Sequence, residues 1–350
     1  MRRIDKKRRI IIGLIAVVIL AALFVFAVHL IEKFGLADVQ FGDIGGWGND
    51  DDEEIILTIG DNDYRSDDDI DTYLFIGTDA GGEDLGMAHS GSLADFLTLL
   101  IVDNTTQKYA FIEIDRNSMA DVQMLDDDGE FTGFYTQQIC LSHWYGIDEQ
   151  QRNENTMAAV SSLFGYLDVQ HCYVLNMADI GAVNHAIGGI EVDIKTDMTT
   201  LDPEFVKGTS VLLTDEQAEK YLRARMAVGE GTNKERMERQ TQYMQKAYNL
   251  VFSQLRENPD YINTLYDELK NVIHSDDEGR DLSVLTNQIL TYDSQGIITI
   301  NGTTKVKDTQ GDGIEHEEFY PESRSIVSAL KSVIDLQLMP ADPDDDSEEE

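Results

Sequence analysis

The side chains best suited to bind an anion lie close together near the middle of this sequence. Residues 221–240, YLRARMAVGEGTNKERMERQ, contain four arginines, and with two lysines they hold six of the chain's 27 basic residues between 220 and 239. The guanidinium group is a planar fork of donors that matches oxyanions such as phosphate. A solvated helix face is the ordinary alternative, but a net charge of −39 weakens it because positive charge is scarce elsewhere. The cluster comprises Lys220, Arg223, Arg225, Lys234, Arg236 and Arg239.

A second group of six basic residues lies within the first nine, MRRIDKKRR, and an apolar stretch follows it. The 22 residues from Ile10 to Ile31 contain no Asp, Glu, Lys or Arg, and as a helix rising about 1.5 Å per residue they would cross a bilayer core of about 30 Å. A cleavable signal peptide is the alternative, but this stretch exceeds the roughly 7–15 residues of such a segment. We therefore expect a transmembrane anchor at 10–31, a cytoplasmic segment at 1–9 and an extracellular remainder.

The composition of the exported part restricts its partners. A strongly acidic domain repels nucleic acid, and no alternation of basic and aromatic residues argues for nucleic-acid binding. Cys140 and Cys172 lie in a compartment that permits a disulfide, and two buried free thiols are the alternative. No spacing of cysteine and histidine indicates a zinc site.

Changes of composition divide the chain. Residues 32–70 contain a Gly- and Asp-rich stretch without apolar periodicity, which predicts a stalk. Residues 339–350 are so acidic that we expect a disordered tail. Between them, 71–257 carries the folded pattern, and 258–338 is expected either to complete that domain or to form an accessory region.

The folded part alternates short strands with helices, which predicts an α/β domain whose mixed central sheet is covered by helices. Thr214 and Gln217 resemble a capping box at one helix start. Strands are predicted at 72–79, 95–103, 108–115, 171–177 and 188–194, and helices at 156–167, 177–188, 214–225 and 234–257.

The order of these segments resembles the LytR-CpsA-Psr family, membrane-anchored proteins of bacterial cell-envelope assembly. The segments that carry the resemblance, from about Tyr73 to Asn249, are FIGTD, LADFLTLLIVDNTTQKYAFIEIDR, QQICLSHWYG, YVLNMADIGAVNHAIGGIEVDI, EQAEKYLRAR and RMERQ. The resemblance implies an α/β sandwich with an apolar tunnel for a lipid. It also implies a transferase that moves a glycopolymer from a polyprenyl pyrophosphate carrier to peptidoglycan.

The resemblance assigns roles residue by residue. Asp79 of GTD and Asp95 of LADF match the family's metal-associated aspartates, and Mg²⁺ suits such oxygen ligands together with a substrate phosphate. Ordinary strand-end aspartates are the alternative. Arg116 of IDR matches the arginine of a Pro-Arg-Asp motif and completes the expected catalytic group. The residues expected to bind pyrophosphate are Arg116, Arg223, Arg225, Arg236, Arg239 and Gln240, with a surface-helix role as the alternative for Arg239.

The sequence also departs from the family's pattern. Ala80 and Leu93 occupy positions where the family usually has arginine, and Asn117 replaces the acidic residue of Pro-Arg-Asp. The usual Lys-Ile-Asn segment is QIC, which gives Gln138 and Cys140. Loss of one donor aimed at developing charge commonly lowers a rate about 10²–10³-fold, so these changes put ordinary turnover in doubt.

Three functions are compatible with this pattern. The first is an active, Mg²⁺-dependent, phosphotransferase-type glycopolymer transferase. The second is a non-catalytic homologue that binds a polyprenyl phosphate lipid or scaffolds envelope assembly. The third is a sensor or attenuator with an intracellular partner, which ranks last because only nine residues precede the expected anchor.

Overall fold

The computed structural model describes residues 54–79, 92–126, 128–224, 228–258, 261–275, 288, 291–307 and 315–340. The expected anchor at 10–31, most of the expected stalk, and the tail from 341 onward lie outside the described residues. Among the helices within these ranges, none is long and apolar enough to cross a membrane.

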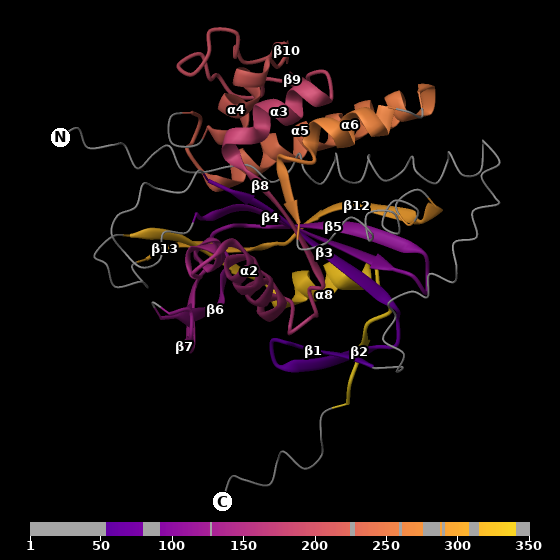
Figure 1. Cartoon of the computed structure of the whole chain (residues 1–350). Coiled ribbons are helices and arrows are strands. Elements are labelled where there is room, and N and C mark those ends of the chain that lie inside the picture. The colour runs from indigo at the N-terminus through magenta and orange to yellow at the C-terminus, as the bar shows by residue number, and fades with distance from the viewer. Residues whose placement is uncertain are drawn as a thin grey trace, which may run out of the picture.

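A mixed six-stranded sheet forms the centre of the fold, with the strand order β11-β8-β3-β4-β5-β12 (Figure 1). Strand β4 is antiparallel to both β3 and β5, whereas β8 runs parallel to β3, and β12 runs parallel to β5. All ten residues of β4 are buried, as expected for a central strand covered on both faces. The strands are β3 (Ile70–Thr78), β4 (Ala94–Asp103), β5 (Lys108–Ile114), β8 (His171–Asn176), β11 (Ile273–Ser275) and β12 (Asp293–Thr299).

Helices cover both faces of this sheet, which confirms the expected mixed α/β architecture. Helices α3 to α6 lie on one face, and α2 and α8 lie on the other (Figure 1). Successive residues of β4 serve the two cores in turn: Phe96 and Leu100 belong to one apolar cluster, and Leu97 and Leu99 to the other. The helices are α2 (Glu149–Leu163), α3 (Ile180–Ala186), α4 (Asp215–Arg223), α5 (Asn233–Glu257), α6 (Tyr261–Leu269) and α8 (Ser323–Lys331).

Side-chain caps fix the starts of the two helices that carry the basic cluster. The capping box predicted at α4 is confirmed, because Thr214 Oγ1 accepts from Gln217 N (3.2 Å) and Gln217 Oε1 accepts from Thr214 N (3.1 Å). At α5, Thr232 Oγ1 accepts from Glu235 N at 3.2 Å. Such caps satisfy backbone donors that have no partner inside the helix.

Four two- or three-stranded units surround the central sheet. The hairpin β1–β2 lies in the range that composition assigned to the stalk, yet Leu57 and Ile59 are buried in the core beside α2 and α8. Strand β1 is a short, mostly apolar run, IILTI, which is too brief to stand out between its acidic flanks. The units pair β1 (Ile55–Ile59) with β2 (Asn62–Ser66) and β15 (Gln337–Leu338), β6 (Met119–Leu125) with β7 (Phe131–Gln138), β9 (Glu191–Asp193) with β10 (Ser210–Leu212), and β13 (Gly302–Lys307) with β14 (His316–Pro321).

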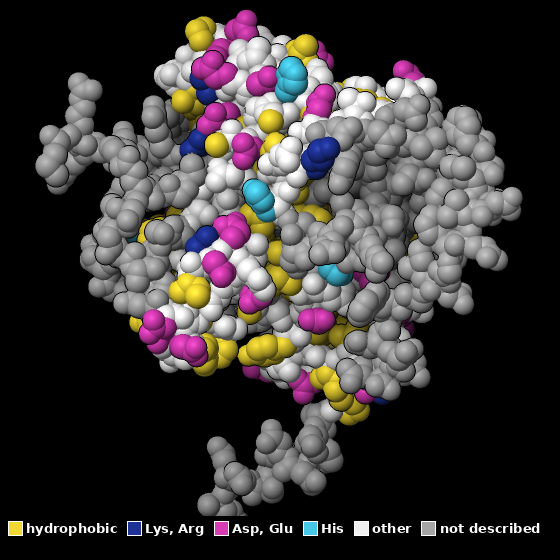
Figure 2. Space-filling view, in the orientation of Figure 1, with side chains coloured by type: hydrophobic (Ala, Val, Ile, Leu, Met, Phe, Trp, Pro, Cys, Tyr) yellow, Lys and Arg dark blue, Asp and Glu magenta, His cyan; other side chains and the backbone are white. Residues whose placement is uncertain are grey.

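Charge is divided between the surface and the interior. Asp and Glu side chains are spread over the face seen in Figure 2, where Lys and Arg side chains are sparse. In contrast, Arg116, Arg236 and Arg239 are buried. Cys140 and Cys172 are both buried free thiols, which decides between the two expectations for the cysteines. These three arginines therefore place positive charge in the interior of a protein whose surface is acidic.

Candidate functional site

The sheet topology brings three of the predicted residues to one end of the central sheet. Asp79 follows β3, and the antiparallel neighbour β4 begins beside it, so that Asp79 N donates to Leu93 O (3.2 Å) and Leu93 N donates to Asp79 Oδ1 (2.9 Å). Strand β5 returns antiparallel to β4 and ends at Ile114, two residues before Arg116. Because adjacent strands are antiparallel, the end of β3, the start of β4 and the end of β5 lie at the same end of the sheet, and they bring Asp79, Asp95 and Arg116 there.

A β-bulge sets the direction of Asp95. Gly77 pairs with Phe96, but the next residue of β3, Thr78, pairs with Ala94, so Asp95 is an additional residue in β4. A bulge interrupts the alternation of a strand and re-aims a side chain, often next to a functional site. The Asp95 carboxylate is buried and lies 2.9 Å from Nε of Arg116.

Arg116 is held on two sides. In addition to the ion pair with Asp95, its Nη2 donates to Sγ of Cys140 at 2.9 Å. Burial is the largest single influence on Arg116 and lowers its pKa, but Asp95, Cys140 and Asp115 together outweigh burial and keep the pKa above the ordinary value. Burial raises the pKa of the Cys140 thiol, although Arg116 and Arg236 both act to lower it, so the thiol stays neutral at ordinary pH. Cys140 thus lies against the guanidinium group of Arg116.

Helix α5 faces this end of the sheet and presents three polar side chains to it. Asn233, Arg236 and Gln240 are spaced three and four residues apart, which places them on one face of the helix. All three are buried, with Arg236 only 1% exposed. The amide of Asn233 ties the helix start to the end of β5, because Nδ2 donates to Asp115 Oδ1 at 2.6 Å. The positive end of the α5 dipole lies at the same place and favours an anion there.

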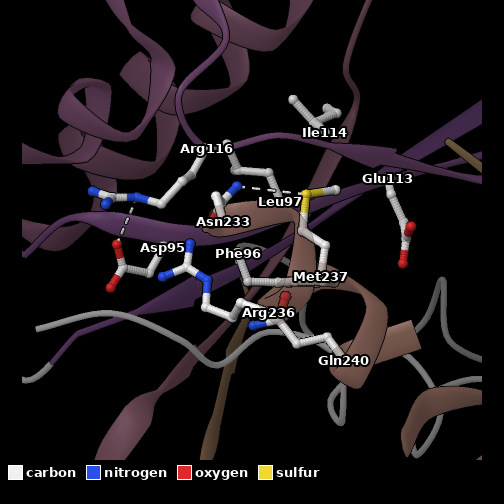
Figure 3. Close-up of a pocket in the computed structure, with 10 residues that line it drawn as sticks. All are labelled: Asp95, Phe96, Leu97, Glu113, Ile114, Arg116, Asn233, Arg236, Met237 and Gln240. Atoms are coloured by element: carbon white, nitrogen blue, oxygen red, sulfur yellow. Dashed lines mark hydrogen bonds and ion pairs between the residues drawn. The ribbon is translucent and has the colours of Figure 1, made fainter. Parts of the chain in front are cut away.

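These residues line one small cavity between the sheet end and α5, with a volume of about 10 Å³, enough for a single water molecule. In Figure 3, the guanidinium groups of Arg116 and Arg236 lie on the same side as Asp95, and Glu113 lies on the far side of Met237. Gln240 Nε2 is buried in the described structure without a hydrogen-bond partner. Lining residues are Asp95, Phe96, Leu97, Glu113, Ile114, Arg116, Asn233, Arg236, Met237 and Gln240.

The remaining predicted arginines are placed elsewhere or not described. Arg223 forms an ion pair with Glu219, one turn earlier on α4. Arg239 donates to the backbone carbonyls of Tyr221 (3.2 Å) and Ala224, at the carboxyl end of α4. It lines a separate pocket with Lys195 and Gln242. These contacts give Arg239 a structural role, because cations satisfy and stabilise the last carbonyls of a helix. Arg225 lies outside the described residues.

Three polar side chains in or beside the pocket were not assigned a role from the sequence: Glu113, Asn233 and Cys140. Glu113 stands at a strand position whose neighbours on the same face, Tyr109 and Phe111, are apolar, and that alternation could have indicated a buried carboxylate. Asn233 immediately follows the cap of α5, a position usually exposed. The contact of Cys140 with Arg116 joins residues 24 positions apart, and no local pattern predicts it.

The donor set at the sheet end suits a metal ion only in part. Within the described ranges, no three His, Cys, Asp or Glu side chains are arranged to hold a metal. Magnesium commonly binds through one or two carboxylates and takes its other ligands from substrate phosphates and water. Asp79 and Asp95 are hard oxygen donors of this kind at the same end of the sheet, so their chemistry suits Mg²⁺ that is completed by a phosphate ligand, although only Asp95 of the two lines the pocket.

Comparison with known proteins gives a consistent result. The model of the LytR_cpsA_psr family matches residues 49–326. No curated protein sequence matches significantly. Among solved structures, protein gbs0355 from Streptococcus agalactiae matches with a TM-score of 0.58 and 17% identity, covering 75% of this chain and 88% of that chain. TagV from B. subtilis matches with a TM-score of 0.55 and 16% identity, covering 75% and 95%.

A further solved structure contains a ligand. TagT bound to LI-WTA matches with a TM-score of 0.53 and 15% identity, covering 75% of this chain and 90% of that chain. At these identities the structural likeness establishes the fold.

Proposed function

The chain belongs to the LytR-CpsA-Psr family, and from this premise we propose that it is a membrane-anchored extracellular transferase of cell-envelope assembly. Its substrate would be a glycopolymer linked to polyprenyl pyrophosphate, and its acceptor peptidoglycan. The complex of TagT, which shares the fold, with LI-WTA supports a glycopolymer ligand. The basic segment and apolar stretch before residue 32 support the anchor and an outward-facing domain.

One observation carries the proposal: two buried guanidinium groups, from Arg116 and Arg236, line the same pocket at the amino end of α5. Burial of two like charges is unfavourable unless anionic groups compensate them. Asp95 lies against Arg116, and the planar forks of both guanidinium groups match the oxygens of a diphosphate. The buried Nε2 of Gln240 supports the same ligand, because a phosphate oxygen could accept its hydrogen bond.

The site residues would act by position and charge. As the glycopolymer leaves the carrier, negative charge grows on the leaving phosphate, and fixed guanidinium groups in a dry pocket stabilise it. Asp79 and Asp95 would hold Mg²⁺, which when bound neutralises phosphate charge. Asp95 and Cys140 hold Arg116 in one orientation, so little reorganisation is needed when the ligand arrives.

A second candidate function is a non-catalytic homologue that binds the lipid carrier or scaffolds envelope assembly. This function is favoured by three departures from the family's pattern. The family usually has two arginines and a carboxylate at positions that are here Ala80, Leu93 and Asn117. Such a protein would keep the anion pocket and lack turnover.

The test uses the full chain extracted in detergent, with farnesyl pyrophosphate as the probe. We expect binding that strengthens with Mg²⁺, and Arg236→Ala should weaken it by about 1.5–3 kcal/mol, the usual worth of a hydrogen bond to a charged group. Arg236→Lys should recover only part of the lost affinity, because lysine keeps the charge but lacks the planar fork of the guanidinium group. Arg324→Ala is the matched control, since Arg324 is exposed and pairs with Glu322.

Four results would contradict parts of the proposal. Equal binding by the wild type and Arg236→Ala would show that the ligand does not bind in this pocket. Binding of equal strength with and without Mg²⁺ would show that Asp79 and Asp95 are ordinary strand-end residues. Binding without transfer from any lipid-linked donor favours the non-catalytic function. Protease shaving of intact cells should cut after Ile31 and spare the first nine residues, and the reverse pattern would exclude an extracellular domain.

A further inference from the structure

Asn233 presents an acceptor to the pocket that the proposed anion cannot satisfy. The residue is 4% exposed and lines the same pocket as Arg116 and Arg236. Its Nδ2 donates to Asp115 Oδ1 at 2.6 Å and to Met237 Sδ at 3.5 Å. A carboxylate only accepts hydrogen bonds, so Asp115 fixes which end of the amide faces it. The other end, Oδ1, is buried and has no hydrogen-bond partner among the described residues.

Such an atom is uncommon in a folded protein. Nearly all buried polar side-chain atoms have a partner, and leaving one without a partner costs about 1–3 kcal/mol. Oδ1 cannot be satisfied by turning the amide over, because Nδ2 would then lose Asp115. Either a water or a group of the ligand that enters the pocket can supply the missing donor.

The chemistry of that group follows from the neighbours of Asn233. A fully ionised diphosphate carries acceptors alone, which suit Arg116, Arg236 and Gln240 but give nothing to Asn233 Oδ1. A ligand that satisfies Asn233 Oδ1 itself carries an O–H or N–H group next to its phosphates. A bare isoprenyl pyrophosphate has none, whereas a sugar attached to the diphosphate has hydroxyl groups and, in amino sugars, an amide.

We propose that Asn233 is a specificity residue that accepts a hydrogen bond from a hydroxyl or amide N–H of the sugar next to the diphosphate. It thereby favours the glycosylated carrier over the bare one. This inference rests on the proposed function and adds to it a means of distinguishing the glycosylated carrier from the bare pyrophosphate. A site built to hydrogen-bond a substrate group discriminates well against an analogue that lacks the group, because its own polar atom is then left unpaired.

The experiment compares two probes on the full chain in detergent: farnesyl pyrophosphate, and farnesyl pyrophosphate carrying one N-acetylglucosamine residue, which offers both kinds of donor. We expect the wild type to bind the glycosylated probe at least about fivefold more tightly, corresponding to one neutral hydrogen bond. Asn233→Ala should bring this ratio close to one and leave the affinity for farnesyl pyrophosphate within about twofold. Loss of fold alone would lower both affinities and would not change their ratio.

Two further variants keep the test decisive. If Asn233→Ala does not fold, Asp115→Ala serves instead, because it removes the acceptor that orients the amide and should also reduce the ratio. Asn258→Ala is the matched control, since Asn258 follows the far end of α5 and is exposed. It should retain the wild-type ratio.

The outcomes separate this inference from the function on which it rests. If the wild type binds neither probe, the proposed function fails. Equal binding of both probes by the wild type overturns the role of Asn233 and leaves the anion pocket intact. An unchanged ratio in Asn233→Ala would indicate that water satisfies Oδ1. An equal loss for both probes that occurs only with Mg²⁺ would identify Asn233 as a metal ligand, and either result overturns the inference.

Discussion

Nη2 of Arg116 donates a hydrogen bond to Sγ of Cys140 at 2.9 Å, and both residues are buried beside the pocket. Nε of the same guanidinium faces Asp95, so two groups on different elements fix its plane. The sequence has cysteine here in place of the asparagine usual in the family. A thiol is a weak acceptor, but it is the side chain that this protein uses to orient Arg116.

The first prediction concerns this contact. Cys140→Ser retains an acceptor and should keep the affinity for farnesyl pyrophosphate, whereas Cys140→Ala should weaken it by about 0.5–1.5 kcal/mol, the net worth of one hydrogen bond. Titration calorimetry on the detergent-extracted chain measures both. In an Arg116→Ala background, Cys140→Ala should have no further effect, because coupled residues are not additive. Full additivity would show that Cys140 acts independently of Arg116.

The second prediction separates Arg239 from the anion pocket. Its guanidinium donates to the carbonyls of Tyr221 and Ala224 and so joins α5 to the end of α4. We expect Arg239→Ala to lower the free energy of unfolding by about 1.5–3 kcal/mol, because carbonyls lose a charged donor. The affinity of the folded protein for farnesyl pyrophosphate should not change. Weaker binding at unchanged stability in thermal and chemical unfolding would instead place Arg239 at the ligand.

Much of the site could be predicted because it depends on strand order. Asp79, Asp95 and Arg116 each lie at the start or end of an apolar strand. In consecutive antiparallel strands, the end of one strand and the start of the next lie at the same end of the sheet. The amino end of α5 was visible in the helical spacing of residues 234–257. The convergence of Arg116 and Arg236 on one pocket agrees with that expectation, although their role in ligand binding stays a prediction.

What could not be predicted depends on side-chain directions. Arg236 and Arg239 are three residues apart in one helix, yet Arg236 lines the pocket and Arg239 turns to the carbonyls of α4. The bulge at Asp95 and the orientation of the Asn233 amide arise from contacts between distant segments. Periodicity gives the face of an element but not the partner that each polar atom finds there.

The third prediction concerns Glu113, a buried carboxylate that links β5 to α5 and β12. Its Oε1 lies 2.7 Å from Thr241 Oγ1, and its Oε2 lies 3.1 Å from Thr299 Oγ1. Thr241 Oγ1 is also 2.9 Å from Met237 O, and its single hydrogen can serve only one of these two acceptors. A protonated Glu113 can donate to Thr241 and so satisfy every group. Burial, opposed by the two threonine hydroxyls, raises the pKa of Glu113.

The sign of the pH dependence follows from that shift. An acid whose pKa is higher in the folded state holds its proton longer there than in the unfolded chain, so its contribution to stability is complete below the unfolded pKa. The contribution is lost as pH rises through the folded pKa. Between about pH 4.5, the ordinary value for glutamic acid, and neutrality, Glu113 should therefore make the protein progressively less stable.

Glu113→Gln tests this directly, because the amide donates to Thr241 and accepts from Thr299 at every pH without carrying charge. We expect this variant to be more stable than the wild type at pH 7 and to differ little from it near pH 4, as measured by urea unfolding across that range. Glu113→Ala should be less stable than both at either pH, since it leaves a cavity and removes the acceptor of Thr299, at a cost of about 1–3 kcal/mol for the lost partner alone. The opposite result would be a Glu113→Gln variant whose stability relative to the wild type falls between pH 4 and pH 7. It would mean that Glu113 is ionised in the folded protein and held by its threonine partners.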